Sequence, residues 1–368
     1  MTRDDVEIKI RRRLEKTVAG SDLLHLGLLL VHSDRLGIHW PLATGVSGED
    51  DRAVQPGDRY HTASIGKAMT AVLVMRLAEQ GRLSPDDPIL RYLPAELLEG
   101  LFVLKGESFA PEVRIRHLLT HTSGVGDWFE DEPKDGSPSF LEQVAADPDT
   151  PWGPEDTLRY HRAHLTAHFP PGEGFHYSDT GYLLLGRLIE VVYGKPLGEV
   201  LTEEIFAPLG MRASCLWGHS EPLDASDQGL LDVWMGEREV SRDAWLPADW
   251  GGGGVVTTME DLLTFHRALV GGSLVSPSTL EQMQQWVKWM RGIDYGYGLV
   301  HLRVRPLTFL MPAKFNMWGN WGSIATFMFY NPHHDVYLIG AFNQAKYVQK
   351  QVVFMIRVLG TLAKISLD

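Results

Sequence analysis

Two groups of strand-like segments lie near the two ends of the chain, and helical patterns fill the region between them. Alternating or continuous apolar positions of strand length occur at 24–32, 37–45, 297–304, 324–332 and 335–344. The first two are separated by the turn sequence SDRLG, which predicts a hairpin. Amphipathic helices are expected before the first group, at about 4–19, and after the last, at 346–365.

The middle of the chain, 97–245, has a mostly helical pattern. It includes an acidic stretch, GDWFEDEPKDGSPSF at 126–140, whose composition is typical of a mobile loop over a site. Strands at both ends with helices between predict an α/β (α+β) fold, in which both termini build one antiparallel sheet flanked by helices. We expect a single domain with an α/β part at 1–96 and 246–368 and an inserted helical subdomain at 97–245.

Composition restricts the classes of partner. The 368 residues carry 34 Lys and Arg against 47 Asp and Glu, a formal charge of −13 without a long acidic or basic block. This balance disfavours nucleic acid as a partner. One cysteine, Cys215, forms no internal pair, and neither a leader-like N-terminus nor an apolar run of about 18 residues is present. We expect a soluble cytoplasmic protein that binds no membrane; the oligomeric state stays open.

A lysine interrupts an otherwise apolar helix pattern in YHTASIGKAMTAVLVMRLAEQG at 60–81. Ser64 and Lys67 are three residues apart, so on a helix they share one face. A serine hydroxyl needs a neighbouring base to become a nucleophile, and a lysine can act so when neutral. That requires its pKa to fall by about three units, roughly 4 kcal/mol. The simpler alternative is a lysine that extends from a core helix to the surface.

Further motifs follow in a fixed order along the chain. Tyr177 lies in a Tyr-Ser-Asp triplet between a Pro-Gly turn and a helix pattern. The segments VRIRHLLTHTSGV (113–125), IFAPLGM (205–211) and GGGGVVTTMEDLLTF (251–265) complete the series. With these motifs, the sequence resembles the serine β-lactamase-like family over about 24–344. This family includes class C β-lactamases, penicillin-binding D-alanyl-D-alanine peptidases, and esterases and amidases.

The resemblance implies acyl transfer through a covalent intermediate. Ser64 corresponds to the acylated nucleophile, Lys67 to its base or proton relay, and Tyr177 to the phenol that shuttles the proton. The backbone N–H groups of Ser64 and Ser323 correspond to the oxyanion hole, where the loss of one donor typically costs about 100- to 1000-fold in rate.

Two departures from the family pattern bear on the substrate, and we expect all four residues involved to contact it. Asn320, Trp321 and Gly322 stand where the family usually has Lys-Thr-Gly or His-Thr-Gly, so the basic residue is absent. Asp179 stands where asparagine is usual, which puts recognition of a substrate amide in doubt. A charge pair between Asp179 and Lys67 would hold the lysine pKa up and make Tyr177 the better base.

The remaining polar motifs favour structural roles. His117 and His121 have the i, i+4 spacing of metal ligands but lack a third partner, so we expect no metal and no organic cofactor. HRAH (161–164) is expected on a solvated helix face, NPHHD (331–335) in a turn, and GGGGVV as a strand entry without direct chemistry. Five aromatic residues fit the core or an acyl pocket: Trp128, Phe129, Trp217, Trp286 and Trp289.

The expected function is that of a serine hydrolase, a carboxylesterase acting on small to medium uncharged esters. An amidase, a D-amino-acid peptidase or a weak β-lactamase is the alternative with the same chemistry, and a non-catalytic binding protein is the alternative from another class.

Overall fold

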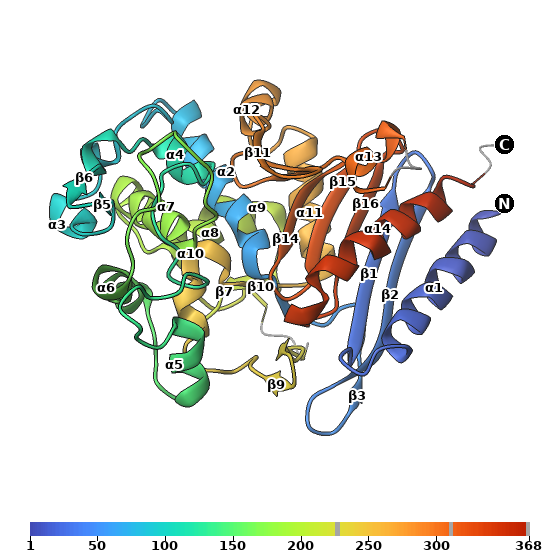
Figure 1. Cartoon of the computed structure of the whole chain (residues 1–368). Coiled ribbons are helices and arrows are strands. Elements are labelled where there is room, and N and C mark those ends of the chain that lie inside the picture. The colour runs from blue at the N-terminus through green and yellow to red at the C-terminus, as the bar shows by residue number, and fades with distance from the viewer. Residues whose placement is uncertain (225–228, 309–311, 366–368) are drawn as a thin grey trace.

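An antiparallel sheet forms the centre of the protein. The computed structural model describes residues 1–224, 229–308 and 312–365, and within them the sheet has nine strands (Figure 1). Their spatial order is β11 (Val287–Met290), β12 (Ile293–Tyr295), β13 (Val300–Leu302), β14 (Met317–Gly322), β15 (Thr326–Asn331), β16 (Val336–Ala341), β1 (Leu26–Ser33), β2 (Ile38–Ser47) and β3 (Arg52–Ala53).

The two ends of the chain meet in the middle of this sheet. β1 pairs with β16 from Leu28 opposite Ala341 to His32 opposite Tyr337. Every residue of β1 is buried, because helices cover both faces of the sheet. The prediction of one antiparallel sheet built from both termini is therefore confirmed.

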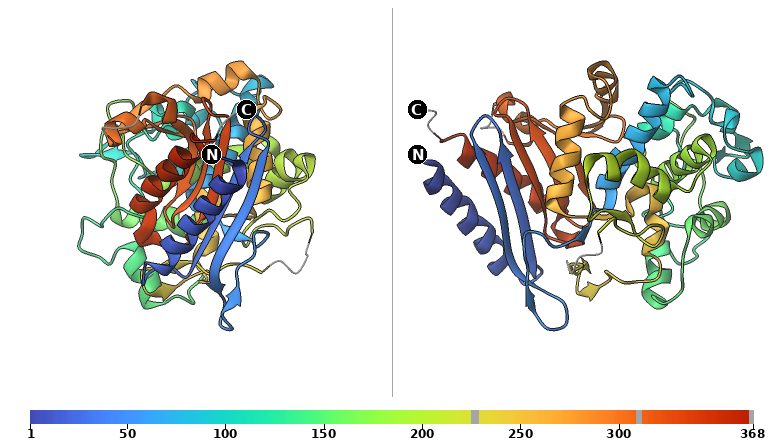
Figure 2. Two further views of the ribbon diagram at one scale, coloured as in Figure 1. Left: turned by 90° about the vertical axis from the view of Figure 1, so that its right-hand side faces the viewer. Right: turned by 180° about the vertical axis from the view of Figure 1, so that it is seen from behind.

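Helices form a layer on each side of the sheet. α1 (Arg3–Ala19) and α14 (Val348–Leu362) cover one face side by side, and the Met1 amino group donates to the Lys364 carbonyl at 3.2 Å (Figure 2). α11 (Met259–Val270) packs on β1, β15 and β16 from the opposite face. Behind α11, toward the helical part, runs α2 (Gly66–Glu79), of which most residues are buried.

The region between the two strand groups is mainly helical, as expected. Its helices are α3 (Ala95–Leu98), α4 (Ile115–Leu119), α5 (Phe140–Ala146), α6 (Pro154–His164), α7 (Asp179–Tyr193), α8 (Leu197–Leu201) and α9 (Ala207–Leu209). It also holds two short hairpins, β5–β6 (Val103–Leu104, Glu107–Ser108) and β8–β9 (Trp234–Met235, Arg238–Glu239). The stretch before α5 is irregular from residue 126 onward, so the loop prediction is confirmed, whereas its mobility stays a prediction.

A second, three-stranded sheet connects the two parts of the chain. β10 (Val255–Thr257) pairs with β4 (Tyr60–His61) on one side and with β7 (Cys215–Leu216) on the other. A strand from the inserted region thus shares a sheet with the α/β part, and the subdomain boundaries at 96 and 246 stay a prediction. Among the described helices, none is both long and apolar enough to cross a bilayer.

Candidate active site

Ser64 lies in a single 3₁₀ turn, Ala63–Ile65, directly before α2. β4 leads into this turn, and the Thr62 amide donates to Val255 of β10 at 2.9 Å. Ala63 has φ of +48°, a left-handed conformation that is uncommon outside glycine. The α-helix therefore begins at Gly66, and a strained turn presents Ser64 at its N-terminal end.

Lys67 is fully buried below this serine. Its Nζ donates to Ser64 Oγ at 2.9 Å, to the Gly252 carbonyl at 2.8 Å and to the Asp179 carboxylate. These contacts match the three donors of an ammonium group. Because the side chain ends inside the protein, the alternative of a lysine that extends to the surface is wrong.

The charge pair with Asp179 determines the protonation of Lys67. Burial by itself pushes the pKa of Lys67 down, but the charges of Asp179, Tyr177 and Asp249 outweigh burial and raise the pKa above its usual value. Lys67 is thus held as an ammonium. This geometry agrees with the sequence-based alternative in which Asp179 keeps the lysine charged.

Tyr177 lies over the lysine in a stack of rings. Its half-buried ring lies between His121, 4.1 Å away between ring centroids, and Trp289, 5.4 Å away. Lys67 Nζ is 5.0 Å from the phenol ring centroid. Burial raises the pKa of Tyr177, while Lys67 and hydrogen bonding to Ser64 work against that rise. Ser64, Lys67 and Tyr177, predicted from separate motifs, therefore meet at one place.

The glycine run forms one helical turn, α10 (Trp250–Gly253), before β10 starts at Val255. The Gly252 carbonyl accepts from Lys67, so the run contacts a candidate catalytic side chain, whereas the absence of direct chemistry in the run stays a prediction. A Cβ on Gly253 would lie 2.6 Å from the Ala63 carbonyl carbon. Only glycine permits this approach, which brings the helix-end carbonyls to the lysine.

The last residues of β14 approach the Ala63–Ile65 turn from the other side. A Cβ on Gly322 would lie 2.5 Å from the Thr62 carbonyl oxygen, and Thr326 Oγ1 donates to the same oxygen at 2.6 Å. Ser323 follows directly in the turn after β14. The close approach of this strand suits an oxyanion hole made by the Ser64 and Ser323 amides, and that role stays a prediction.

Asn320 and Trp321 differ in what they offer a substrate. Asn320 is buried; its amide donates to the Gly298 carbonyl at 2.9 Å and its oxygen accepts from the Trp321 amide at 2.8 Å. Both polar atoms are already bonded within the protein, and a substrate contact of Asn320 stays a prediction. The half-buried Trp321 ring lies 5.7 Å from Trp289. Tyr177, Trp289 and Trp321 thus form one continuous aromatic wall.

Carboxylates surround Lys67, and sequence reasoning singled out only Asp179. The Asp179 amide donates to Asp127 Oδ1 at 2.8 Å. Burial and the charge of Asp179 raise the pKa of Asp127 well above its usual value and that of Asp249 to about 7. Burial and Asp179 also raise the pKa of Glu130. Asp127 and Glu130 come from the acidic loop, which the sequence did place over a site.

Other histidine and tryptophan motifs lie elsewhere. His117 accepts from the Arg114 amide, while His121 accepts from the Ser178 amide behind Tyr177, so each has a structural partner. His161 is fully buried in α6, and the predicted solvated face is wrong for it. Trp128 packs in the core against Phe140.

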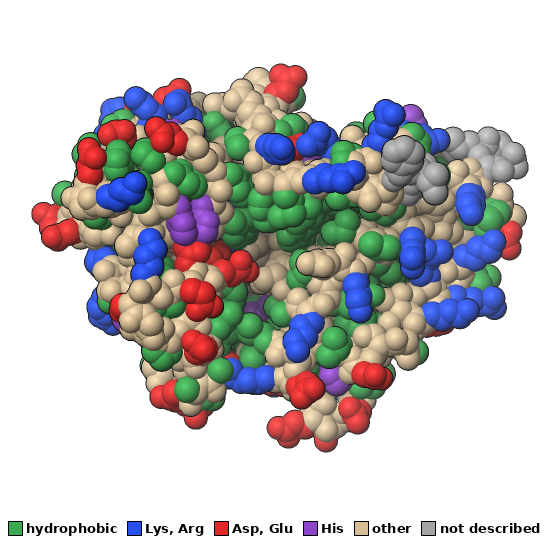
Figure 3. All heavy atoms as spheres, viewed as in Figure 1, with side chains coloured by type: hydrophobic (Ala, Val, Ile, Leu, Met, Phe, Trp, Pro, Cys, Tyr) green, Lys and Arg blue, Asp and Glu red, His purple; other side chains and the backbone are tan. Residues whose placement is uncertain are grey.

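A cleft of about 820 Å³ adjoins the aromatic wall. Its lining includes Thr122, Phe175, Trp286, Val287 and Tyr297, and Phe175 stacks on Trp289 at 5.7 Å between centroids. The space-filling view shows a hollow lined by hydrophobic side chains, with histidine and acidic side chains at its rim (Figure 3). Neither Ser64 nor the rings of Tyr177, Trp289 and Trp321 line the 820 Å³ cleft, which is connected to them through the stacking of Phe175 on Trp289.

Comparison with known proteins places these residues in a family context. Residues 22–354 match the model of the beta-lactamase family. Penicillin-binding protein 4* of Bacillus subtilis (strain 168) is 29% identical over 68% of this chain and 54% of its own, and esterase EstB of Burkholderia gladioli is 32% identical over 47% of this chain and 42% of its own. The chain thus spans about half the length of these curated relatives.

Solved structures agree on the fold. D-amino acid amidase from Ochrobactrum anthropi SV3, complexed with D-phenylalanine, superposes with a TM-score of 0.78 at 21% identity, covering 98% of this chain and 99% of its own. At this identity the likeness concerns the fold alone. Because the family model matches nearly the whole length of the chain, the chain belongs to the beta-lactamase family.

Proposed function

We propose that the protein is a serine hydrolase that works through an acyl-enzyme on Ser64, and that its preferred substrates are small to medium uncharged esters. The observation that carries the proposal is the hydrogen bond of 2.9 Å between Lys67 Nζ and Ser64 Oγ beneath the Tyr177 ring. A serine becomes a nucleophile when a neighbouring group takes its proton, and this cluster offers one.

The proposed reaction has two halves. Ser64 Oγ attacks the ester carbonyl carbon while its proton passes to Tyr177 in its phenolate form, which becomes populated toward alkaline pH because the pKa of Tyr177 is raised. Lys67 stays charged beside both oxygens. The amides of Ser64 and Ser323 stabilise the carbonyl oxygen, and the proton then moves from Tyr177 to the departing alkoxide. In the second half, water attacks the acyl-enzyme carbonyl by the same proton transfers through Tyr177, which releases the acid and restores the Ser64 hydroxyl.

The walls of the site support an apolar ester. Trp289 and Trp321 present half-buried rings, and the three residues at 320–322 carry no cation to pair with a substrate carboxylate. The Asp179 carboxylate is paired with Lys67, so the buried lysine offers no free positive charge to an anionic substrate. Both features argue against β-lactams and peptides that end in a carboxylate close to the scissile bond.

A second candidate is an amidase for substrates that carry an ammonium group. It is favoured by the Asp179 carboxylate and by three more acidic side chains near it, Asp127, Glu130 and Asp249, whose pKa values are raised by burial and by Asp179. A substrate ammonium near the acyl carbon would favour the ionised forms of these groups and could pair with them. The similarity in fold to a D-amino acid amidase is compatible with it.

A substrate panel tests the choice. We expect p-nitrophenyl acetate, butyrate and octanoate to give higher kcat/KM than nitrocefin, a D-Ala-D-Ala peptide or D-phenylalanine amide, with Ser64→Ala as the inactive control. If the amide with a free ammonium is hydrolysed fastest, the second candidate replaces the first. Preference for nitrocefin or the D-Ala-D-Ala peptide would refute both.

A further inference from the structure

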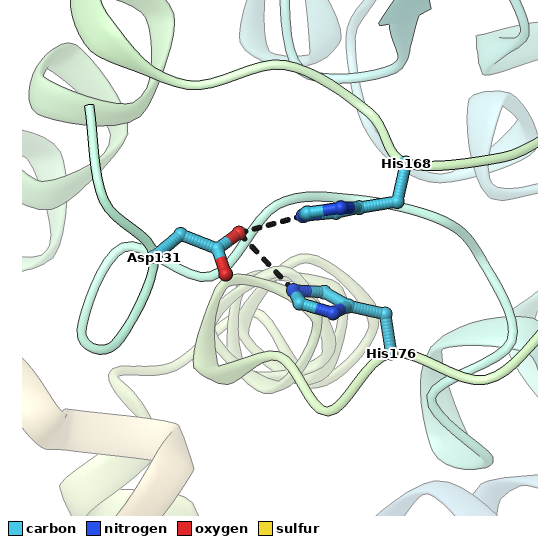
Figure 4. A group of neighbouring side chains, drawn as sticks. All are labelled: Asp131, His168 and His176. Carbon is cyan, nitrogen blue, oxygen red and sulfur yellow. Dashed lines mark hydrogen bonds and ion pairs between the residues drawn. The ribbon is translucent and has the colours of Figure 1, made fainter. Parts of the chain in front are cut away.

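Three residues from distant points of the chain meet at Asp131. His168 Nε2 lies 2.8 Å and His176 Nε2 lies 3.1 Å from Asp131 Oδ2, and the three ligand-type atoms are within 4.8 Å of one another. The two imidazole rings lie one above the other with the carboxylate in front of both (Figure 4). We propose that this cluster is a binding site for a divalent transition-metal ion of the zinc class.

The donor set suits such an ion. Two imidazole nitrogens and one carboxylate oxygen are common ligands of Zn²⁺, and three protein ligands leave a fourth position for water. Bond lengths of about 2.0–2.1 Å and tetrahedral angles put ligand atoms about 3.3 Å apart. The nitrogen-to-oxygen distances of 2.8 and 3.1 Å are within a few tenths of an ångström of that spacing.

The ligands are held in place by the backbone. The His168 amide donates to the Gly124 carbonyl at 2.8 Å, and the His176 amide donates to the His121 carbonyl at 2.9 Å. The Asp127 amide donates to Asp131 Oδ2 at 2.7 Å, which orients the carboxylate. Such outer contacts pre-organise metal ligands. The side chains of Asp131 and His176 are 17% and 25% exposed, so most of the cluster is covered. The His168 side chain is 35% exposed, which leaves an entry path for an ion.

The site is joined to the catalytic groups by short connections. His176 directly precedes Tyr177, and Asp127, which donates to Asp131, accepts from the Asp179 amide. A bound metal therefore fixes the acidic loop against the segment that carries the tyrosine. Its role is positioning, because Asp131, His168 and His176 do not touch the reacting atoms.

The competing interpretation is a hydrogen-bonded latch, in which both imidazoles donate to Asp131 and nothing is bound. Glutamine distinguishes the two, because its amide can still donate to the carboxylate but is a poor ligand for zinc. His164 provides the matched control, since it pairs with Asp135 in the same region at 3.0 Å.

The experiment uses the whole 368-residue chain, freed of metal with EDTA. It is titrated without substrate, with Zn²⁺ by calorimetry and with Co²⁺ by visible absorption. We expect one equivalent to bind saturably, the His168→Gln and His176→Gln proteins to lose at least about 10-fold in affinity, and His164→Gln to bind as the wild type does. Asp131→Asn replaces any glutamine variant that fails to fold, as judged by circular dichroism, and should show the same loss.

Absence of saturable binding by the wild-type protein, or equal affinities in all folded variants, would overturn the proposal in favour of the latch. Because the readout is metal binding, its outcome is independent of whether the protein is an esterase.

Discussion

Replacing Asp179 by asparagine removes one charge from the pair that holds Lys67 as an ammonium. Lys67 is fully buried, so solvent screens the pair little. For two charges about 4 Å apart at an effective dielectric constant of about 20, Coulomb's law gives about 4 kcal/mol, equivalent to about three pKa units. The Asp179→Asn substitution should therefore lower the pKa of Lys67 by about that much, so that the neutral amine forms at a lower pH than in the wild-type protein.

The assay is the pH dependence of kcat/KM for a p-nitrophenyl ester. In the wild-type protein, Lys67 and Tyr177 both have raised pKa values, so kcat/KM should rise toward alkaline pH. In the Asp179→Asn protein a neutral Lys67 can accept the serine proton, and the half-maximal point should move to lower pH by one to three units. Asp34→Asn, which breaks an exposed pair with Arg267, is the control and should leave the profile in place. An unchanged or alkaline-shifted profile for Asp179→Asn would refute the charge-pair account.

Three further substitutions probe other parts of the site. Gly322→Ala places a methyl group 2.5 Å from the Thr62 carbonyl oxygen and should cost about 100-fold or more in kcat. The control Gly57→Ala, at a position with open space, should change kcat little; equal activities of the two variants would count against the oxyanion assignment. Trp289→Ala removes the ring stacked on Tyr177 and should lower kcat/KM about 10-fold. Trp286 stacks on His301 instead, so Trp286→Ala should leave kcat/KM near the wild-type value; a larger loss for Trp286→Ala than for Trp289→Ala would contradict the assignment of Trp289 to the site. The pKa of Asp249 is about 7 instead of 3.8, so the folded protein binds more protons than the unfolded chain between about pH 4 and 7, and stability falls as pH rises through that window. The melting temperature of Asp249→Asn should therefore fall less steeply with rising pH than that of the wild-type protein. Identical slopes would contradict the raised pKa.

The fold was predictable because its strongest signals are local. The strands at 24–32 and 335–344 are long and apolar, and both became buried central strands, β1 and β16. β11 and β12 were not predicted, although Val287–Met290 alternates between half-buried and exposed residues, because each is only three or four residues long and follows a helix pattern. Short strands of this kind depend on their neighbours in the sheet more than on their own sequence.

The three candidate catalytic residues lie in sequence motifs, whereas the groups around them do not. Ser64, Lys67 and Tyr177 each lie in a recognisable sequence context, and the Asp179 exchange already suggested a charge pair. The hydrogen bond from Lys67 to Gly252 and the effect of Asp249 on the Lys67 pKa both depend on the close approach of α10 to the Ala63–Ile65 turn. The spacing of residues along the sequence does not indicate this approach. Distance along the chain hid the Asp131–His168–His176 cluster for the same reason: its members are brought together only by backbone pairing between two loops.

Covalent capture of the nucleophile tests the central claim most directly. The protein is exposed to a fluorophosphonate, digested and examined by mass spectrometry, with Ser64→Ala treated in parallel. The account predicts a single adduct on the peptide that contains Ser64, slower labelling after Lys67→Ala, and no adduct in the Ser64→Ala protein. Labelling of another residue, or persistent labelling of the Ser64→Ala protein at the same stoichiometry, would contradict an acyl-enzyme on Ser64.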